Sequence, residues 1–272
     1  MKPENFWYLR DLIRRHAAIV LEPEKQYLIR ARLNSLAKKE NLESVDDLVE
    51  QLRARPHGPL NARVVESLVT TETSFFRDIH PYETLKEHVF PELLEKRKLS
   101  RTLYLWSAAC ASGQEPYSLS IMIREFFPHL TGWTVRVMAS DLSSEMIERA
   151  KSGRYTQLEV NRGMPSRLLI KYFKRDGVMW QVNDEIRTMV EFKKINLADP
   201  FPPLLRMDVV FLRNVLIYFD DDNKREILAK IARQLRPDGF LFVGGAETLI
   251  GYDQHYRRIR IDKTSCYQPL EQ

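Results

Sequence analysis

Cysteine is scarce in this sequence of 272 residues, in which only Cys110 and Cys266 occur. Two cysteines allow at most one disulfide and cannot form a cysteine-based zinc cluster. No stretch approaches the roughly eighteen apolar residues that a membrane-spanning helix requires. The first residues, MKPENFWYLRDLIRR, lack the basic-then-apolar order of a signal peptide. These absences predict a cytoplasmic protein that is not inserted in a membrane.

Positive charge is concentrated at the start of the chain. Residues 1–39 contain nine Lys or Arg and four acidic residues, so this segment alone carries +5, which equals the formal net charge of the whole chain. Charge runs of this kind are usually solvated helix faces, and charge alone favours that interpretation. The alternative is a docking surface for an acidic partner.

The first part of the chain is predicted to be helical throughout. Ser44 followed by two aspartates is typical of a helix start, and residues 55–59, RPHGP, are typical of a stop. Apolar residues up to about residue 70 recur at helical spacing, in the groups Phe6, Leu9, Ile13; Ile29, Leu33, Leu36; and Val45, Leu48, Val49, Leu52. We therefore expect a small all-α domain over residues 1–76.

Strands and helices alternate from about residue 100 onwards. Helices are expected at 117–127, 143–151 and 222–235. The apolar segments that read as strands are 102–107, 133–140, 190–195, 207–214 and 240–245. This alternation predicts a parallel sheet with helices on both faces, and such sheets bind ligands beyond the carboxyl ends of their strands.

Polar residues follow the first four of these strands. Glu115 follows the first strand and Asp141 the second, where an acid can bond the hydroxyls of a ribose. Asn196 and Leu197 follow the third strand, and Arg213, Asn214 and Val215 follow the fourth. Each polar residue alone could instead cap a helix or form a turn. Their recurrence along one rim of one sheet favours a ligand site.

The segment 103-LYLWSAACASGQEPYS-118 has the form of a nucleotide-binding loop but contains a single glycine, Gly113. Pyrophosphate-binding loops use several glycines because backbone amides must approach the phosphates closely. The chain also lacks the G-x-x-x-x-G-K-[ST] motif. Glu115 would repel phosphate and suits a cation, such as the α-ammonium of a methionine moiety. The loop therefore favours S-adenosylmethionine, in which adenosine and methionine share a positive sulfonium.

Several segments together resemble one protein family over about residues 6–268. The two most specific are TSFFR and RNVLIYFD. The matching segments are 70-TTETSFFRD-78, 106-WSAACASGQEPYS-118, 140-SDLSSEMIERA-150 with 153-GRY-155, 195-INLADPF-201, 211-FLRNVLIYFD-220 and 235-LRPDGFLFVGGAE-247. In this order they resemble the chemotaxis receptor glutamate methyltransferases, the CheR family.

The resemblance implies an all-α domain followed by a class I S-adenosylmethionine-dependent methyltransferase domain, a Rossmann-like α/β fold, over residues 77–272. A small β-subdomain is expected to interrupt it at about 172–192. The implied activity is methyl transfer to glutamate side chains of bacterial chemoreceptors, with S-adenosylhomocysteine as product and no metal. Carried over position by position, the cofactor-binding residues are Thr71, Thr73, Arg77, Glu115, Asp141, Asn196, Leu197, Asn214 and Val215. The chain departs from the family pattern at Thr71, where asparagine is common, and at residues 245–246.

The implied chemistry needs alignment more than proton transfer. A glutamate carboxylate has a reference pKa near 4.3 and is already ionised at pH 7, so its attack on a sulfonium methyl needs no general base. The enzyme must instead hold the attacking oxygen, the methyl carbon and the sulfur in line, which lowers the entropic part of the reaction barrier. Arg77 is the candidate for orienting a carboxylate, and Tyr218 could supply a hydroxyl at the same rim. We predict these two residues as catalytic.

A receptor partner would explain the basic start of the chain. Lys25, Arg32 and Lys39 recur every seven residues, so a helix over 24–39 would present them as one stripe. Receptor methylation sites of the family lie on acidic helices. We therefore expect this stripe to dock the receptor.

The inserted β-subdomain bears on a second docking mode. Residues 178–192 alternate like a hairpin, with its turn at 183–185. In the family this subdomain can accept a receptor's carboxyl-terminal tail as an added strand, and members that do so have a longer, glycine-containing loop before the hairpin. Here only residues 173–177 precede Val178. We therefore expect a monomer whose docking is independent of a carboxyl-terminal pentapeptide tail.

Two other functions are alternatives for a chain with this predicted fold. Enzymes that methylate amino groups of nucleic-acid bases carry an Asn/Asp-Pro-Pro-Tyr loop after the fourth strand, whereas residues 214–218 read NVLIY. No aromatic-rich basic groove is apparent either, so no nucleic-acid partner is expected. A non-catalytic adaptor that only binds the cofactor is disfavoured by the presence of Arg77 and Asp141.

Overall fold

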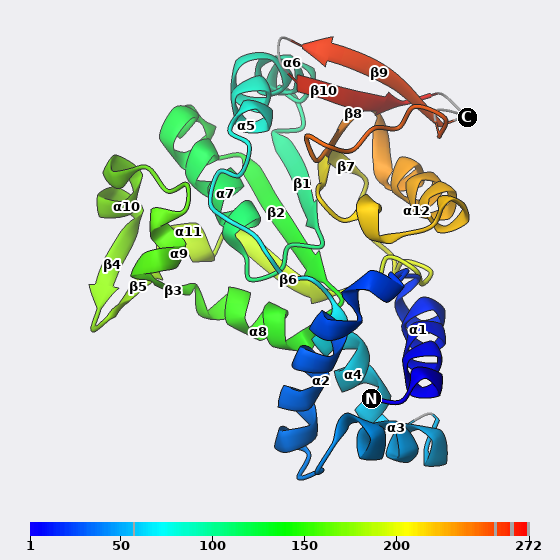
Figure 1. Ribbon diagram of the computed structural model, residues 1–272. Coiled ribbons are helices and arrows are strands. Elements are labelled where there is room, and N and C mark those ends of the chain that lie inside the picture. The colour runs from blue at the N-terminus through cyan, green and yellow to red at the C-terminus, as the bar shows by residue number, and fades with distance from the viewer. Residues whose placement is uncertain (57, 253–254, 262–263, 271–272) are drawn as a thin grey trace.

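The computed structural model describes the chain except residues 57, 253–254, 262–263 and 271–272, and the side chain of Lys25. A helical domain formed by the first part of the chain lies against one end of a larger α/β domain (Figure 1). A small insertion projects from the α/β domain at the left of this view.

The described part of the helical domain contains four helices, and the three groups of periodic apolar residues fall in the first three of them. Ser44 caps the third helix, since its side chain accepts a hydrogen bond from the backbone N–H of Asp47. Leu9, Leu33 and Leu48, one from each of the first three helices, are fully buried. The helices are α1 Pro3–Ala17, α2 Gln26–Lys39, α3 Val45–Ala54 and α4 Pro59–Leu68, with a 3₁₀ turn at Pro23–Lys25 before α2.

A seven-stranded sheet forms the centre of the α/β domain, in the order β6-β2-β1-β7-β8-β10-β9. The first five strands in this order pair in parallel, which confirms the expectation from the alternating pattern. The last two are antiparallel and were not foreseen. The strands are β1 Thr102–Ala108, β2 Thr134–Asp141, β6 Val190–Lys194, β7 Met207–Leu212, β8 Leu235–Val243, β9 Tyr256–Ile261 and β10 Thr264–Pro269.

Helices cover both faces of this sheet, so its central strands are apolar on both sides. All six residues of β7 are buried: Val209 and Phe211 belong to the core on one face, and Val210 and Leu212 to the core on the other. The second of these cores also contains Leu9 and the other buried residues of the helical domain, so the two domains share it. The flanking helices are α5 His80–Thr84, α6 Phe90–Lys96, α7 Gln114–Phe126, α8 Ser144–Ser152 and α12 Asp221–Gln234.

The insertion contains a separate three-stranded sheet in the order β3-β5-β4. The hairpin predicted over 178–192 is wrong: the chain turns at Gly177, whose φ is +60°, and residues 190–194 join the main sheet. The predicted turn is instead the start of a short helix, because alternation over a few residues cannot distinguish one helical turn from a loop. The elements are β3 Arg154–Thr156, α9 Gln157–Asn161, α10 Ser166–Tyr172, β4 Phe173–Asp176, β5 Met179–Val182 and α11 Asp184–Arg187.

A buried ionic network joins the amino-terminal ends of the central strands. The side chain of Asp208 is 0% exposed and accepts hydrogen bonds from Nε of Arg97 at 2.8 Å and from the backbone N–H of Tyr104 at 2.8 Å. Arg97 also bonds both carboxylate oxygens of Asp238, at 2.6 and 3.0 Å. These bonds raise the pKa of Arg97 and lower that of Asp238, so this pair is ionised in the folded protein.

Replacing Asp208 by alanine is expected to lower the free energy of unfolding by about 3 kcal/mol, because Arg97 loses one buried partner and the amide of Tyr104 loses its acceptor. Urea unfolding followed by circular dichroism measures this. Asp11→Ala, at an exposed position of α1, is the matched control and should leave the unfolding midpoint nearly unchanged. Equal midpoints for the two variants would show that the network does not stabilise the fold.

Candidate active site

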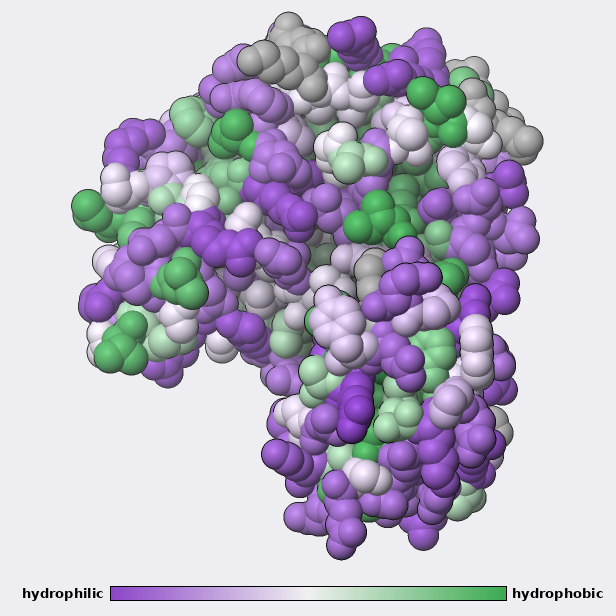
Figure 2. All heavy atoms as spheres, viewed as in Figure 1, coloured by the Kyte–Doolittle hydropathy of each residue, from purple (hydrophilic) through white to green (hydrophobic). Residues whose placement is uncertain are grey.

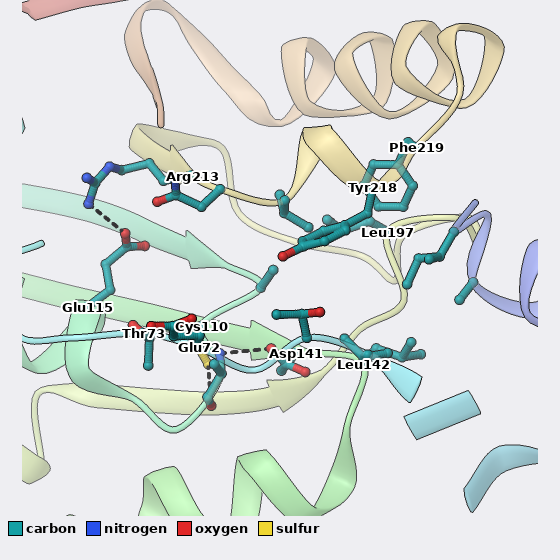
Figure 3. Close-up of a pocket in the computed structure, with 18 of the residues that line it drawn as sticks. Glu72, Thr73, Cys110, Glu115, Asp141, Leu142, Leu197, Arg213, Tyr218 and Phe219 are labelled. Atoms are coloured by element: carbon teal, nitrogen blue, oxygen red, sulfur yellow. Dashed lines mark hydrogen bonds and ion pairs between the residues drawn. The ribbon is translucent and has the colours of Figure 1, made fainter. Parts of the chain in front are cut away.

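A cavity lies at the carboxyl ends of β1, β2 and β7, where the α/β domain meets the helical domain (Figure 3). It encloses about 840 Å³, open space at its mouth included. Its wall has three sources: the end of α1 with Ile19, the segment between the two domains, and the loops that follow the strands.

The backbone conformation of the loop after β1 shows why this loop needs only one glycine. Ala109 and Ala111 adopt positive φ angles of 58° and 47°, a conformation that costs a non-glycine residue roughly 1–2 kcal/mol. Gly113, with φ of +94°, begins α7, and a Cβ there would lie 2.9 Å from the Cβ of Ala150. Glycine is therefore kept where a side chain would collide, and alanines occupy the strained positions that face the cavity.

Asp141 stabilises this loop and lies on the cavity wall, as expected from its position after β2. Its two carboxylate oxygens accept hydrogen bonds from the backbone N–H groups of Ala111, at 2.8 Å, and Ser143, at 2.9 Å. Burial raises the pKa of Asp141, and the two amide bonds oppose that rise. Each oxygen retains a further lone pair, so the carboxylate can still accept a ligand hydroxyl.

Glu115 reaches the cavity but does not carry a free charge. It accepts hydrogen bonds from Oγ of Ser107 at 2.8 Å and from Arg213 at 3.1 Å (Figure 3). Burial raises the pKa of Glu115, whereas the positive charge of Arg213 lowers it. The glutamate is thus held in one orientation by Arg213, a rim residue for which the sequence predicted no role.

Arg213 makes three hydrogen bonds within the site. Its side chain is only 1% exposed, and it donates to Asp78 at 3.0 Å and to the backbone carbonyl of Arg77 at 2.8 Å, in addition to Glu115. Burial alone would lower the pKa of Arg213, but the neighbouring negative charges raise it. The sequence feature that points to a role for Arg213 is its position directly after a buried strand, within the segment RNVLIYFD.

The segment between the domains lines the cavity in part. Thr73 and Arg77 lie on its wall, and the guanidinium of Arg77 donates to the backbone carbonyl of Glu72 at 3.2 Å. Thr71 is not on the wall, whereas its neighbours Thr70 and Glu72 are. The structure therefore brings two of the three predicted residues of this segment to the cavity.

The loops after β6 and β7 supply the opposite wall. Asn196, Leu197, Asn214 and Val215 all line the cavity, as expected. The amide of Asn196 is already engaged, because its Nδ2 donates to the backbone carbonyl of His16 at 2.7 Å and its Oδ1 accepts from the amide of Ala198 at 3.1 Å. Asn214 has a positive φ of 58°, which fixes where the loop turns.

Tyr218 extends from the 3₁₀ turn Leu216–Tyr218, and its hydroxyl points into the cavity (Figure 3). The helical domain holds its backbone, since the N–H of Val20 donates to the carbonyl of Tyr218 at 2.9 Å and Ile19 forms a β-bridge with Phe219. Arg14 adds a hydrogen bond to Asp220 at 3.0 Å. The position of Tyr218 therefore depends on both domains.

Glu247 is a second residue that the sequence analysis did not assign. Its carboxylate accepts hydrogen bonds from the backbone N–H groups of Asn214 and Gly244, both at 2.7 Å, and of Ile217 at 3.3 Å. One side chain thereby ties the loop after β7 to the loop after β8. A lone glutamate past a strand end carries no signal of such bonding.

The three residues of the predicted docking stripe differ in the structure. Lys39 is exposed at the end of α2. Arg32 is half-buried and donates to the backbone carbonyls of Leu68, at 2.7 Å, and Val69, at 3.2 Å, which end α4. The side chain of Lys25 lies outside the described part of the chain.

The described residues include neither a metal-binding cluster nor a membrane-spanning helix. No cluster of three or more His, Cys, Asp or Glu side chains that could hold a metal ion occurs among them. Nor does any helix in the part of the chain that the structure describes reach the length and apolar character needed to cross a membrane.

Comparisons with known proteins agree with this geometry. The family model of the CheR methyltransferase all-alpha domain matches residues 4–65, and that of the CheR methyltransferase SAM-binding domain matches residues 71–265. Chemotaxis protein methyltransferase Cher2 of Pseudomonas putida is 40% identical over 268 residues, which are 97% of each chain. Chemotaxis protein methyltransferase 1 of Pseudomonas aeruginosa is equally similar, and a chemotaxis protein methyltransferase of Vibrio anguillarum is 34% identical over 92% of this chain and 91% of that one.

The fold and the cavity define a class I S-adenosylmethionine-dependent methyltransferase. The chain belongs to the CheR methyltransferase family and is an S-adenosylmethionine-dependent enzyme of chemotaxis. The predicted resemblance is thereby confirmed.

The cavity wall fits this cofactor chemically. Asp141 and Glu115 offer carboxylate oxygens to hydroxyl and ammonium groups. The side chains of Leu142, Ile195 and Leu197 provide an apolar stretch suited to an aromatic base. Acids and apolar residues around one cavity match a ligand that is both cationic and aromatic.

Replacing Glu247 by alanine is expected to lower kcat/KM for methyl transfer at least tenfold, since the loop that carries Asn214 and Tyr218 loses its three-point anchor. Glu247→Gln, which keeps one acceptor oxygen, should recover part of the activity. Steady-state kinetics with labelled S-adenosylmethionine measures both variants. Glu95→Ala, an exposed glutamate of α6, is the control; a Glu247→Ala enzyme as active as this control would contradict the anchoring role.

Proposed function

We propose that the enzyme methylates glutamate side-chain carboxylates on bacterial chemoreceptors and yields glutamate methyl esters. The observation that carries this proposal is the composition of the cavity. Among its described lining residues, Arg77 and Tyr218 offer groups suited to a carboxylate, while no histidine or lysine is present to act as a base. An acceptor that is already ionised at pH 7 needs no base.

We propose that Asp141 binds the ribose hydroxyls of S-adenosylmethionine and that Glu115, held by Arg213, binds its α-ammonium. Asn196, Leu197, Asn214 and Val215 would complete the cofactor's surroundings. When bound, the cofactor supplies an electrophilic methyl group on a sulfonium. The chain's own contribution is to hold its polar groups in fixed directions, which the backbone bonds to Asp141 and the Glu115–Arg213 pair support.

Arg77 is proposed to orient the acceptor carboxylate. It is half-buried, lies on the cavity wall and makes one bond to a backbone carbonyl, at 3.2 Å, which leaves most of its donors available. A planar guanidinium can bind both oxygens of a carboxylate at once. The hydroxyl of Tyr218 can donate to the same group from the opposite wall.

The proposal predicts that the enzyme transfers labelled methyl groups from S-adenosylmethionine to receptor-bearing membranes as base-labile esters. Arg77→Ala should lower this rate at least a hundredfold, and Arg77→Lys should recover little of it, because a point charge does not reproduce a planar fork. Thermal melting of both variants checks that the fold is intact. Absence of labelled receptor with the wild-type enzyme would overturn the proposed function, whereas active Arg77 variants would overturn only the role of Arg77.

We propose that the receptor's acidic helices dock on α2. Arg32 caps α4 and is a poor choice for substitution, because its loss would expose the carbonyls of Leu68 and Val69. Lys39, at the exposed end of α2, and Lys25 therefore represent the predicted stripe in an experiment. The excess of positive charge in residues 1–39 supports this docking mode.

The double variant Lys25→Glu/Lys39→Glu is expected to raise KM for receptor severalfold and to leave cofactor affinity unchanged. Raising the salt concentration should slow the native reaction, because exposed charges are screened. Initial rates at several ionic strengths, with calorimetry for the cofactor, measure these effects. If the double variant keeps the native KM at low salt, the stripe is an ordinary solvated surface and does not dock the receptor.

Docking is proposed to be independent of a receptor tail, and the enzyme is proposed to act as a monomer. The hairpin of the insertion turns tightly, with β4 ending at Asp176 and β5 starting at Met179. This leaves no loop next to edge strand β4 to hold an added peptide. Receptor carboxyl-terminal pentapeptides should therefore bind with dissociation constants well above micromolar in calorimetry. Low-micromolar binding would reverse this conclusion.

A further inference from the structure

Glu66 of α4 reaches from the helical domain to the α/β domain, close to the active-site cavity. On the face shown in Figure 2, the helical domain touches the α/β domain but is separated from the insertion by open space. Glu66 lines a second hollow, together with Leu142 and Asn196, which also line the cavity. Glu66 is not among the described residues of the cavity wall, so any influence on a cofactor must pass through residues that are.

The carboxylate of Glu66 accepts hydrogen bonds at both oxygens from the α/β domain, and its side chain is only 16% exposed. Oε2 accepts from the backbone N–H of Ser144 at 3.0 Å and from Oγ of Ser143 at 3.4 Å. Oε1 accepts from Nζ of Lys194 at 2.8 Å and from Oγ of Ser144 at 3.3 Å. One side chain thereby connects the helical domain to the start of α8 and to the end of β6.

The start of α8 is a favourable place for a carboxylate. Ser143 caps this helix, since its Oγ accepts from the N–H of Met146 at 3.3 Å. The N–H of Ser144, at the first helical position, cannot bond within the helix and needs an acceptor from elsewhere. Glu66 supplies that acceptor from the other domain, and its negative charge lies at the positive end of the helix dipole. The position of this helix start therefore depends on α4.

The residues that Glu66 holds are the immediate neighbours of Asp141. Asp141 ends β2, and it pairs with Lys194 of β6 in the parallel sheet. Ser143 contacts both acids, because its N–H donates to Oδ1 of Asp141 at 2.9 Å and its hydroxyl bonds Glu66. Leu142 lies between them on the cavity wall. A shift of the start of α8 would therefore turn the carboxylate of Asp141 and move Leu142.

We propose that Glu66 is a positioning residue of the cofactor site, which fixes the direction in which Asp141 presents its carboxylate to the ribose hydroxyls of S-adenosylmethionine. The inference rests on the proposed ribose-binding role of Asp141. Glu66 touches neither the cofactor nor the acceptor and acts by holding Ser143, Ser144 and Lys194 in place. The helical domain would then complete the cofactor site in addition to docking the receptor.

The test is calorimetry of S-adenosylhomocysteine binding, which needs no receptor. Glu66→Ala is expected to raise the dissociation constant about fivefold, because the start of α8 loses a charge-assisted bond. Glu66→Gln, which keeps an acceptor for the N–H of Ser144, should lie between Glu66→Ala and the native enzyme. The matched control is Glu40→Ala, since Glu40 is 23% exposed and pairs at 2.7 Å with Arg63, inside the helical domain. This control should leave the dissociation constant native.

A double-mutant cycle with Asp141 distinguishes positioning from a general effect on the fold. Asp141→Ala alone should weaken binding about tenfold. In that background Glu66→Ala should add less than about twofold, because the residue through which it acts is gone. A second ligand gives the same comparison without a second substitution: the affinity for an S-adenosylhomocysteine analogue that lacks both ribose hydroxyls should not change in Glu66→Ala.

The outcomes separate this inference from the proposed function. Native affinity in Glu66→Ala, additive effects of the two substitutions, or an equal loss of affinity for the analogue would each overturn the inference alone. An equal loss in Glu40→Ala would also overturn it, because the effect would then come from the stability of the helical domain. Native affinity in Asp141→Ala would overturn the role of Asp141 and the inference with it. Receptor methylation is tested separately, by the transfer of labelled methyl groups.

Discussion

The active site depends on the hydrogen bonds that the buried guanidinium of Arg213 makes. It bonds Glu115 from α7, Asp78 ahead of α5 and the backbone carbonyl of Arg77. Burying a charge costs several kcal/mol unless partners compensate, so these bonds must form together. They fix the direction of Glu115 inside the cavity and the course of the chain that carries Arg77.

The helical domain contributes to the site as well as to the proposed docking surface. Val20 holds the backbone of Tyr218, and His16 accepts from Asn196. Glu66 on α4 accepts hydrogen bonds from the amide of Ser144 at 3.0 Å and from Lys194 at 2.8 Å, next to the strand end that carries Asp141. A receptor bound to α2 would therefore contact a domain that is hydrogen-bonded to both walls of the cavity.

Two carboxylates shape the rim by bonding backbone amides. Asp141 holds the strained alanine loop after β1, and Glu247 joins the loops after β7 and β8. Amide–carboxylate bonds are charge-assisted and directional, so they stabilise positive φ angles at Ala111 and Asn214 that would otherwise be costly. The rim is thus rigid where a cofactor is expected to meet the chain.

The sequence predicts the helical domain, the five parallel strands and the positions of Glu115, Asp141, Asn196 and Asn214 beyond the ends of those strands. These follow from apolar periodicity and from the rule that ligands bind at strand ends, both of which are local or topological. The sequence does not show which of these residues form hydrogen bonds with which partners, because that depends on the tertiary structure. Arg213, Glu247 and Arg32 act through partners distant in sequence, and the turn of the insertion depends on a register that short alternation does not specify. Long-range hydrogen bonds leave no periodic trace in a sequence, because each needs only one donor and one acceptor brought together by the fold.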